Sequence, residues 1–163
     1  MKPHPLILLL MTAGLAGCSD QPKTDRPQAA APHRHEHTPP HGGTPVVLGD
    51  EEHHLEIVRE AGTGKLTAFV LDGHLEQFIR ITAPSFTLEV AAPRATLTFR
   101  AVTNSASGET FGDTAQFEAQ ADWLKTTPAF DAVLPSLSVR AKTYTNVAFN
   151  FPKGNETGEE GRP

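Results

Sequence analysis

The chain has 163 residues, with 14 lysines and arginines against 19 aspartates and glutamates and a formal net charge of −5. A chain of this length has room for about one domain, and its acidic balance argues against nucleic acid as a partner. The single cysteine excludes an internal disulfide and a metal site built from several cysteines.

Residues 1–17 have the pattern of a secretory signal. Lys2 supplies a positive charge, an apolar run follows from Pro5 to Met11, and small residues lead up to Gly17. The apolar run is too short to cross about 30 Å of hydrocarbon as a permanent helix. We therefore expect residues 1–17 to be a signal peptide that is absent from the mature protein.

Leu15-Ala16-Gly17-Cys18 resembles the lipobox of bacterial lipoproteins, in which small residues precede a cysteine that takes up diacylglycerol before cleavage. The resemblance implies lipidation at Cys18 and a protein that is anchored in the bacterial cell envelope and faces the periplasm. Several acyl chains give lasting attachment to a membrane, whereas one chain binds only marginally. The sorting rule of the lipoproteins that this motif resembles implies that Ser19 after the cysteine favours the outer membrane over the inner one.

Residues 18–40 are rich in proline, alanine, threonine and charged side chains and lack an apolar period, which predicts a disordered tether. The tether contains three alternate histidines, here called the tether tract: His33, His35 and His37. Residues two apart project the same way in an extended segment, so these imidazoles could close around one divalent ion. The alternative interpretation is a solvated tether in which histidine replaces other polar residues.

Residues 41–152 are expected to form one mainly β domain. Short runs rich in valine, isoleucine, threonine, phenylalanine and leucine alternate with glycine, proline, asparagine and aspartate, as strands alternate with turns. The stretch 120–135 breaks this rhythm and predicts a short helix or plugging loop. The predicted strands cover 44–48, 53–60, 65–71, 78–81, 85–91, 95–103, 114–119, 136–140 and 143–151, with hairpin turns at 60–64 and 92–94.

Many short antiparallel strands with little helix favour an immunoglobulin-like antiparallel β-sandwich made of two sheets. Trp123, Phe130 and Phe149 are predicted to contribute to its core. Residues 153–163 are rich in glycine, glutamate and asparagine and are expected to form a disordered tail.

Seven of the eight histidines lie between His33 and His74. Imidazole binds borderline divalent ions near neutral pH, because much of it is unprotonated there and has a lone pair to donate. Cysteine and methionine, the ligands suited to Cu(I), are missing near these histidines in the mature chain. The pattern therefore favours Zn(II), Cu(II) or Ni(II) as the bound ion.

A second candidate site lies in the predicted domain. His54 and Glu56 share one face of their strand, and a turn centred on Gly62 would place Asp72 diagonally across from His54. A register slip of one residue would move His54 to the other face. The alternative interpretation is an edge-strand polar pair without metal. The mixed nitrogen and oxygen donors of this candidate site are His54, Glu56 and Asp72, with His41 or His74.

Pro40-His41-Gly42-Gly43-Thr44, continued by His54-Leu55-Glu56, resembles a module of small bacterial envelope lipoproteins and of periplasmic parts of heavy-metal efflux systems. The resemblance runs from His41 to about Asp72. It implies periplasmic metal handling, with His41, His54 and Glu56 at the matching positions and a metal-efflux or other envelope protein as partner.

No pattern in the chain indicates catalysis. The cysteine is assigned to lipid, no serine lies in a Gly-x-Ser-x-Gly elbow, and Gly62-Thr63-Gly64-Lys65 lacks the first glycine of a phosphate loop. We therefore expect a non-enzymatic, membrane-anchored lipoprotein that binds divalent transition metal ions and supports metal efflux or homeostasis. The alternative is a protein-interaction module of the cell envelope with no metal role.

Overall fold

A computed structural model describes residues 38–156 of the chain. Within this part, eight antiparallel strands follow one another, and no helix is long and apolar enough to span a membrane. The elements are β1 Thr44–Leu48, β2 His53–Glu60, β3 Lys65–Asp72, β4 Ser85–Val90, β5 Ala95–Ala101, β6 Gln116–Gln120, the 3-10 helix η1 Asp122–Lys125, β7 Phe130–Val139 and β8 Lys142–Phe151.

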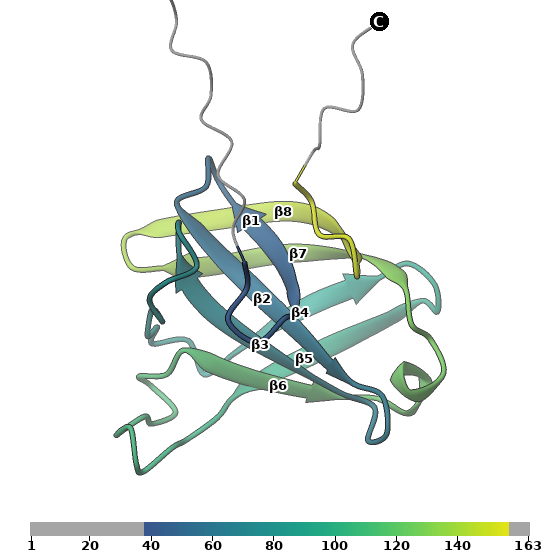
Figure 1. Cartoon of the computed structure of the whole chain (residues 1–163), viewed down its shortest axis with the longest axis horizontal. Helices are drawn as coiled ribbons and strands as arrows, with labels where there is room; N and C mark the ends of the chain where they lie inside the picture. The colour runs from purple at the N-terminus through teal and green to yellow at the C-terminus, as the bar shows by residue number, and fades with distance from the viewer. Residues whose placement is uncertain (1–37, 157–163) are drawn as a thin grey trace, which may run out of the picture. The chain divides into compact units, whose positions relative to one another are not determined.

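The strands form one sheet in the order β1-β2-β3-β6-β5-β4-β7-β8, which curls until β1 approaches β8 (Figure 1). The sheet is a nearly closed barrel, so the predicted sandwich of two separate sheets is wrong. Two short ladders join the strands into a single sheet. In one, β5 pairs with β6 at Ala101–Phe117, and in the other, β4 pairs with β7 at Val90–Ala132. Pairing between segments distant in sequence leaves no trace in a local alternation pattern.

Most of the predicted strands are confirmed with small shifts at their ends, although the strand predicted at 136–140 begins six residues earlier, at Phe130. The segment 78–81 is an exception, because it contributes only isolated bridges at Phe78 and Ile81. The expected helix or plugging loop over 120–135 is present as η1, but β7 follows it from Phe130 onward. Alternate burial of Phe130, Ala132 and Leu134 shows that this stretch has the period of a strand.

Alternate residues of β3, β5 and β7 fill the interior of the barrel. Phe130 stacks on Phe151 with ring centroids 5.2 Å apart, and Trp123 meets Phe130 edge-on at 5.4 Å. Phe149 is buried as well. The predicted contribution of these aromatic residues to the core is therefore confirmed. Burial of each large apolar side chain stabilises the fold by about 2 to 3 kcal/mol.

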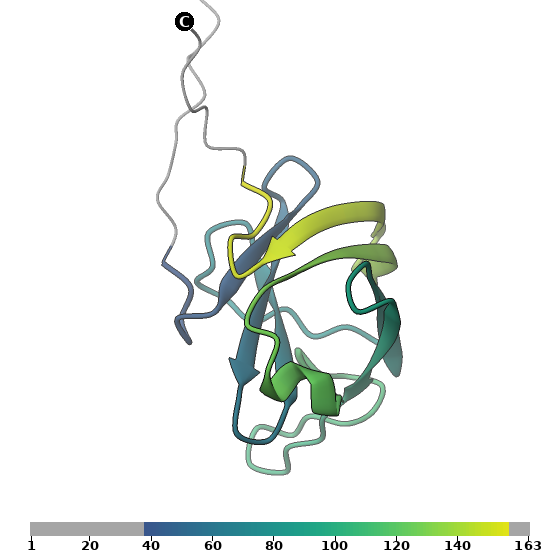
Figure 2. The same cartoon turned by 90° about the vertical axis from the view of Figure 1, so that its right-hand side faces the viewer.

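The seam between β1 and β8 is covered by residues that follow β8. The Val47 N–H donates to Asn155 Oδ1 at 2.7 Å, and Asn155 Nδ2 donates to the Val47 carbonyl at 3.1 Å. The side-chain amide of Asn155 thus makes the pair of hydrogen bonds that a peptide group of a neighbouring strand would make. Pro45, two residues earlier on this edge, has no N–H to leave unpaired. Figure 2 shows the segment after β8 folding back beside β1. Packed contacts thus continue past the predicted boundary at Pro152.

A buried histidine near the start of β2 belongs to a chain of hydrogen bonds. His53 is 9% exposed, and its Nδ1 lies 2.7 Å from the hydroxyl of Tyr144, which donates to Glu52 at 3.2 Å. Burial and the positive charge of Arg140 lower the pKa of His53, and the partial opposing effect of Asp72 does not reverse the shift. The folded barrel therefore favours the neutral form of His53.

We expect the barrel to lose stability as the pH falls below 6.5, the ordinary pKa of histidine. Below this pH, His53 binds a proton more readily in the unfolded chain than in the folded barrel. The free energy of unfolding therefore decreases as the pH falls from 6.5 toward the lowered pKa of the folded state. Urea unfolding between about pH 7 and about pH 5 measures the effect. His53→Asn keeps a donor for Tyr144 but does not titrate, and an equally steep decline in this variant would contradict the assignment.

Candidate functional site

The sequence-predicted site residues fall into two groups. Cys18 and the tether tract lie outside the described residues, whereas the other five lie on or beside β1, β2 and β3. Among residues 38–156, no three histidine, cysteine, aspartate or glutamate side chains form a group that could hold a metal ion. The five described residues are His41 before β1, His54 and Glu56 on β2, Asp72 at the end of β3 and His74 in the following turn.

The pairing of β2 with β3 separates the side chains of His54 and Asp72. The ladder pairs His53 with Asp72 and His54 with Leu71. The centre of the turn therefore lies between Gly62 and Thr63 and not on Gly62 itself. The predicted register is therefore wrong by one residue, and the side chains of Asp72 and His54 belong to opposite faces of the sheet. His54 is fully buried, and its Nδ1 lies 3.2 Å from the backbone carbonyl oxygen of Asp72.

Asp72 organises the turn that follows β3. Its Oδ1 accepts the N–H groups of Glu76 at 2.9 Å and Gln77 at 3.2 Å. Burial raises the pKa of Asp72, but these donors and His74 outweigh burial, so the pKa is lowered overall. The carboxylate of Asp72 thus stabilises the turn that contains His74.

His41 and Glu56 are predicted ligands that the fold brings into direct contact. Glu56 is fully buried on β2, on the face away from the core residues Leu55 and Ile57. Its Oε1 accepts the N–H groups of His41 at 2.8 Å and Gly43 at 2.9 Å, and its Oε2 lies 2.8 Å from His41 Nδ1. These donors compensate for the burial of the carboxylate. The chain that enters β1 is therefore fastened to β2 by Glu56.

The two glycines after His41 allow this contact. Gly42 has a φ of +65°, in the left-handed region that favours glycine. A Cβ on Gly43 would lie 2.7 Å from the carbonyl oxygen of Ile57 and 2.8 Å from Cγ of Glu56. The His-Gly-Gly run thus has a local physical reason, because it brings two backbone N–H groups onto a buried carboxylate.

The imidazole of His41 is held in a defined orientation. Its ring is stacked on Phe69 with centroids 3.9 Å apart and planes 12° from parallel. The contact between Nδ1 and Glu56 favours a proton on Nδ1, which leaves the lone pair on Nε2. Within residues 38–156 no hydrogen bond engages Nε2, and the side chain is 39% exposed. Metal-binding histidines are commonly oriented by such a carboxylate.

A cleft of about 300 Å³ opens beside the ring of His41. One part of its lining is aromatic and is here called the aromatic wall: His41, Phe69 and Phe78. Phe78 has its ring centroid 5.7 Å from that of His41 and 5.9 Å from that of Phe69, and it is 49% exposed. The polar part of the lining includes Arg80, Ser107, Glu109 and Gln116.

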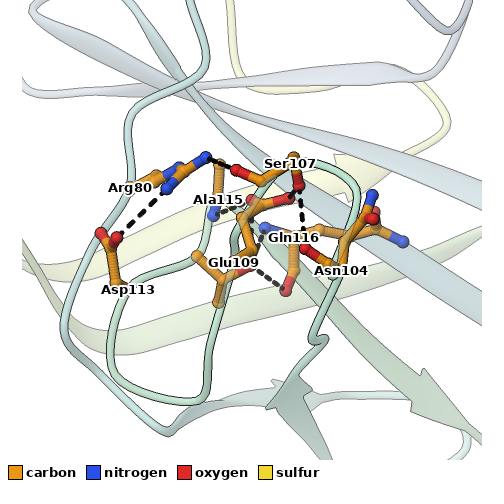
Figure 3. Close-up of polar contacts among 8 residues, drawn as sticks. Arg80, Asn104, Ser107, Glu109, Asp113, Ala115 and Gln116 are labelled. Atoms are coloured by element: carbon orange, nitrogen blue, oxygen red, sulfur yellow. Dashed lines mark hydrogen bonds and ion pairs between the residues drawn. The ribbon is translucent and has the colours of Figure 1, made fainter.

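The loop between β5 and β6 is held in place around Glu109 (Figure 3). The carboxylate accepts the Ala115 N–H at 3.0 Å, the Thr114 hydroxyl at 3.2 Å and the Ser107 hydroxyl at 2.6 Å. Burial raises the pKa of Glu109, but these donors and nearby Arg80 outweigh burial and hold the pKa below its ordinary value. Sequence reasoning missed this loop, because its local pattern does not differ from that of an ordinary turn.

No family model matches the chain, and no curated protein or solved structure is significantly similar to it. The likeness of residues 41–72 to envelope metal-handling modules therefore stays a prediction. The features of the chain that bear on its function are the orientation of His41 by Glu56 and the histidines that precede His41.

Proposed function

We propose that the protein is a lipoprotein of the bacterial cell envelope, attached through Cys18, that binds divalent transition metal ions where its tether meets the barrel. The ion is cargo, captured in the periplasm and passed to an efflux or other envelope protein. Zn(II), Cu(II) and Ni(II) suit the proposed ligands, which are the imidazoles of His33, His35, His37 and His41. The observation that carries the proposal is the 2.8 Å contact between Glu56 and His41 Nδ1.

Glu56 acts in this proposal as the residue that positions His41. A histidine whose Nδ1 is bound to a carboxylate keeps a fixed tautomer and a fixed ring orientation. The side chain of His41 is 39% exposed, so Nε2 can meet an ion at the surface. Because Glu56 is fully buried, its carboxylate positions the imidazole from behind and does not itself reach the ion.

The tether tract is close enough in sequence to share an ion with His41. Its last member, His37, precedes His41 by four residues, a segment that spans at most about 14 Å when extended. A first ligand that is already fixed on the barrel lowers the ordering cost of capturing the ion.

The described residues fit this role only together with the tract, since they form no metal group of three on their own. His54 and Asp72 do not belong to the proposed set. His54 is fully buried against a backbone carbonyl, and the carboxylate of Asp72 is occupied in a turn. The module-like pattern from His41 to Asp72 thus contributes His41 as a ligand and Glu56 as its support.

Calorimetric titration of residues 19–163 with Zn(II), Cu(II) and Ni(II) tests the proposal. Joint replacement of the tether tract by alanine is expected to abolish most binding, and His41→Ala is expected to weaken it at least about tenfold. His74→Ala removes an exposed imidazole outside the proposed set and should leave the affinity unchanged. Absence of binding by the unaltered chain would overturn the proposal and favour an envelope interaction module without a metal role.

A further inference from the structure

The cleft beside His41 combines exposed aromatic surface with a polar loop, and the proposed metal site uses only His41 among the residues that line it. Phe78 is 49% exposed, although a side chain of its size usually lies in the core. Its ring lies against the other two rings of the aromatic wall. A concave surface that joins apolar rings to a few fixed polar groups is typical of a ligand site.

The charged residues of the lining itself are one cation, Arg80, and one anion, Glu109. Arg80 is paired with Asp113 at 3.2 Å and donates to the Ser107 carbonyl, and Glu109 accepts three hydrogen bonds from its own loop. A charged ligand would meet one like and one opposite charge in this cleft. A neutral ligand with hydroxyl groups can donate to the carboxylate and accept from the guanidinium.

A sugar ring has the two surfaces that this lining requires. Its face presents polarised C–H groups, which are attracted to the negative face of an aromatic ring. Its edge presents hydroxyls that both donate and accept. The volume of about 300 Å³ lies at the small end of ligand pockets and has room for about one such ring. We infer that the cleft is a saccharide-binding site in which one neutral sugar ring packs against Phe78.

NMR titration of residues 19–163 with glucose and N-acetylglucosamine, and with their disaccharides, tests the inference. The expected result is a shift of the backbone amides of Arg80, Glu109 and Gln116. Phe78→Ala should weaken sugar binding about tenfold, because it removes the exposed ring. The matched control is Phe111→Ala, since Phe111 is 65% exposed on the same loop as Glu109 but does not line the cleft. The affinity of this variant for sugar should be unchanged.

Benzoate and benzylamine serve as charged aromatic competitors in the same titration. The inference is overturned if no sugar shifts the cleft amides, if either charged compound binds more tightly than the sugars, or if Phe78→Ala and Phe111→Ala lose affinity equally. If a disaccharide binds more tightly than its monosaccharide, the inference is supported and the natural ligand is part of a glycan. If the two bind equally well, the inference is supported and the natural ligand is a free sugar. Unchanged zinc affinity in Phe78→Ala separates this site from the metal proposal.

Discussion

Glu56→Ala is expected to destabilise the barrel by about 3 kcal/mol. The carboxylate is fully buried and accepts the backbone N–H groups of His41 and Gly43 as well as His41 Nδ1. Truncation leaves these donors without an acceptor and opens a cavity under the segment that leads into β1. Most of the loss comes from the two backbone donors, because the imidazole is 39% exposed and can turn to water.

Urea unfolding of the unaltered protein and of Glu56→Ala measures this loss of stability. Glu118→Ala on β6 is the matched control, since Glu118 is a half-buried carboxylate whose partner Lys65 is also partly exposed. Such pairs contribute about 0.5 kcal/mol. If Glu56→Ala were as stable as Glu118→Ala, the role assigned to Glu56 as the fastening of the chain would be wrong.

Gly154→Ala is expected to open the seam between β1 and β8 and to cost about 3 kcal/mol. Gly154 has a φ of +80°, and a Cβ there would collide with the carbonyl oxygen of Pro45. The segment must then move away from β1, which uncovers the Val47 groups that Asn155 now satisfies. Because an uncovered strand edge pairs readily with another, the variant is also expected to form dimers.

Sedimentation velocity and urea unfolding report these two effects. Gly108→Ala is the control, because Gly108 also has a positive φ, +73°, but a Cβ there would meet no atom within 4 Å. It should cost about 1 kcal/mol and stay monomeric. A Gly154→Ala protein that matches this control in both measurements would show that the segment after β8 does not protect the edge of β1.

Local features of the barrel were predictable and its closure was not. The strands predicted at 85–91 and 95–103 are confirmed as β4 and β5. The glycines at positions 62 and 64 marked the hairpin between β2 and β3 but left its register open by one residue. The ladders that turn the strands into one sheet join β5 to β6 across a long loop and β4 to β7 across two intervening strands. No local period could therefore distinguish a barrel from a sandwich.

The candidate site was predictable in residue type more than in arrangement. The pattern around His41 and Glu56 indicated that both residues matter, and the structure brings them into contact. It did not indicate that Glu56 would be buried beneath His41, because burial depends on how residues 38–43 fold over β2. Arg80 and Glu109 were missed since only the fold of the loop between β5 and β6 places them on one cleft.

NMR correlation of the histidine ring nitrogens during a zinc titration of residues 19–163 tests the metal proposal most directly. The expected result is a change at Nε2 of His41, together with changes in the tether tract, while Nδ1 of His41 keeps the proton that it shares with Glu56. A tract that responds to zinc while the ring of His41 stays unchanged would contradict the proposal, as would zinc bound through Nδ1.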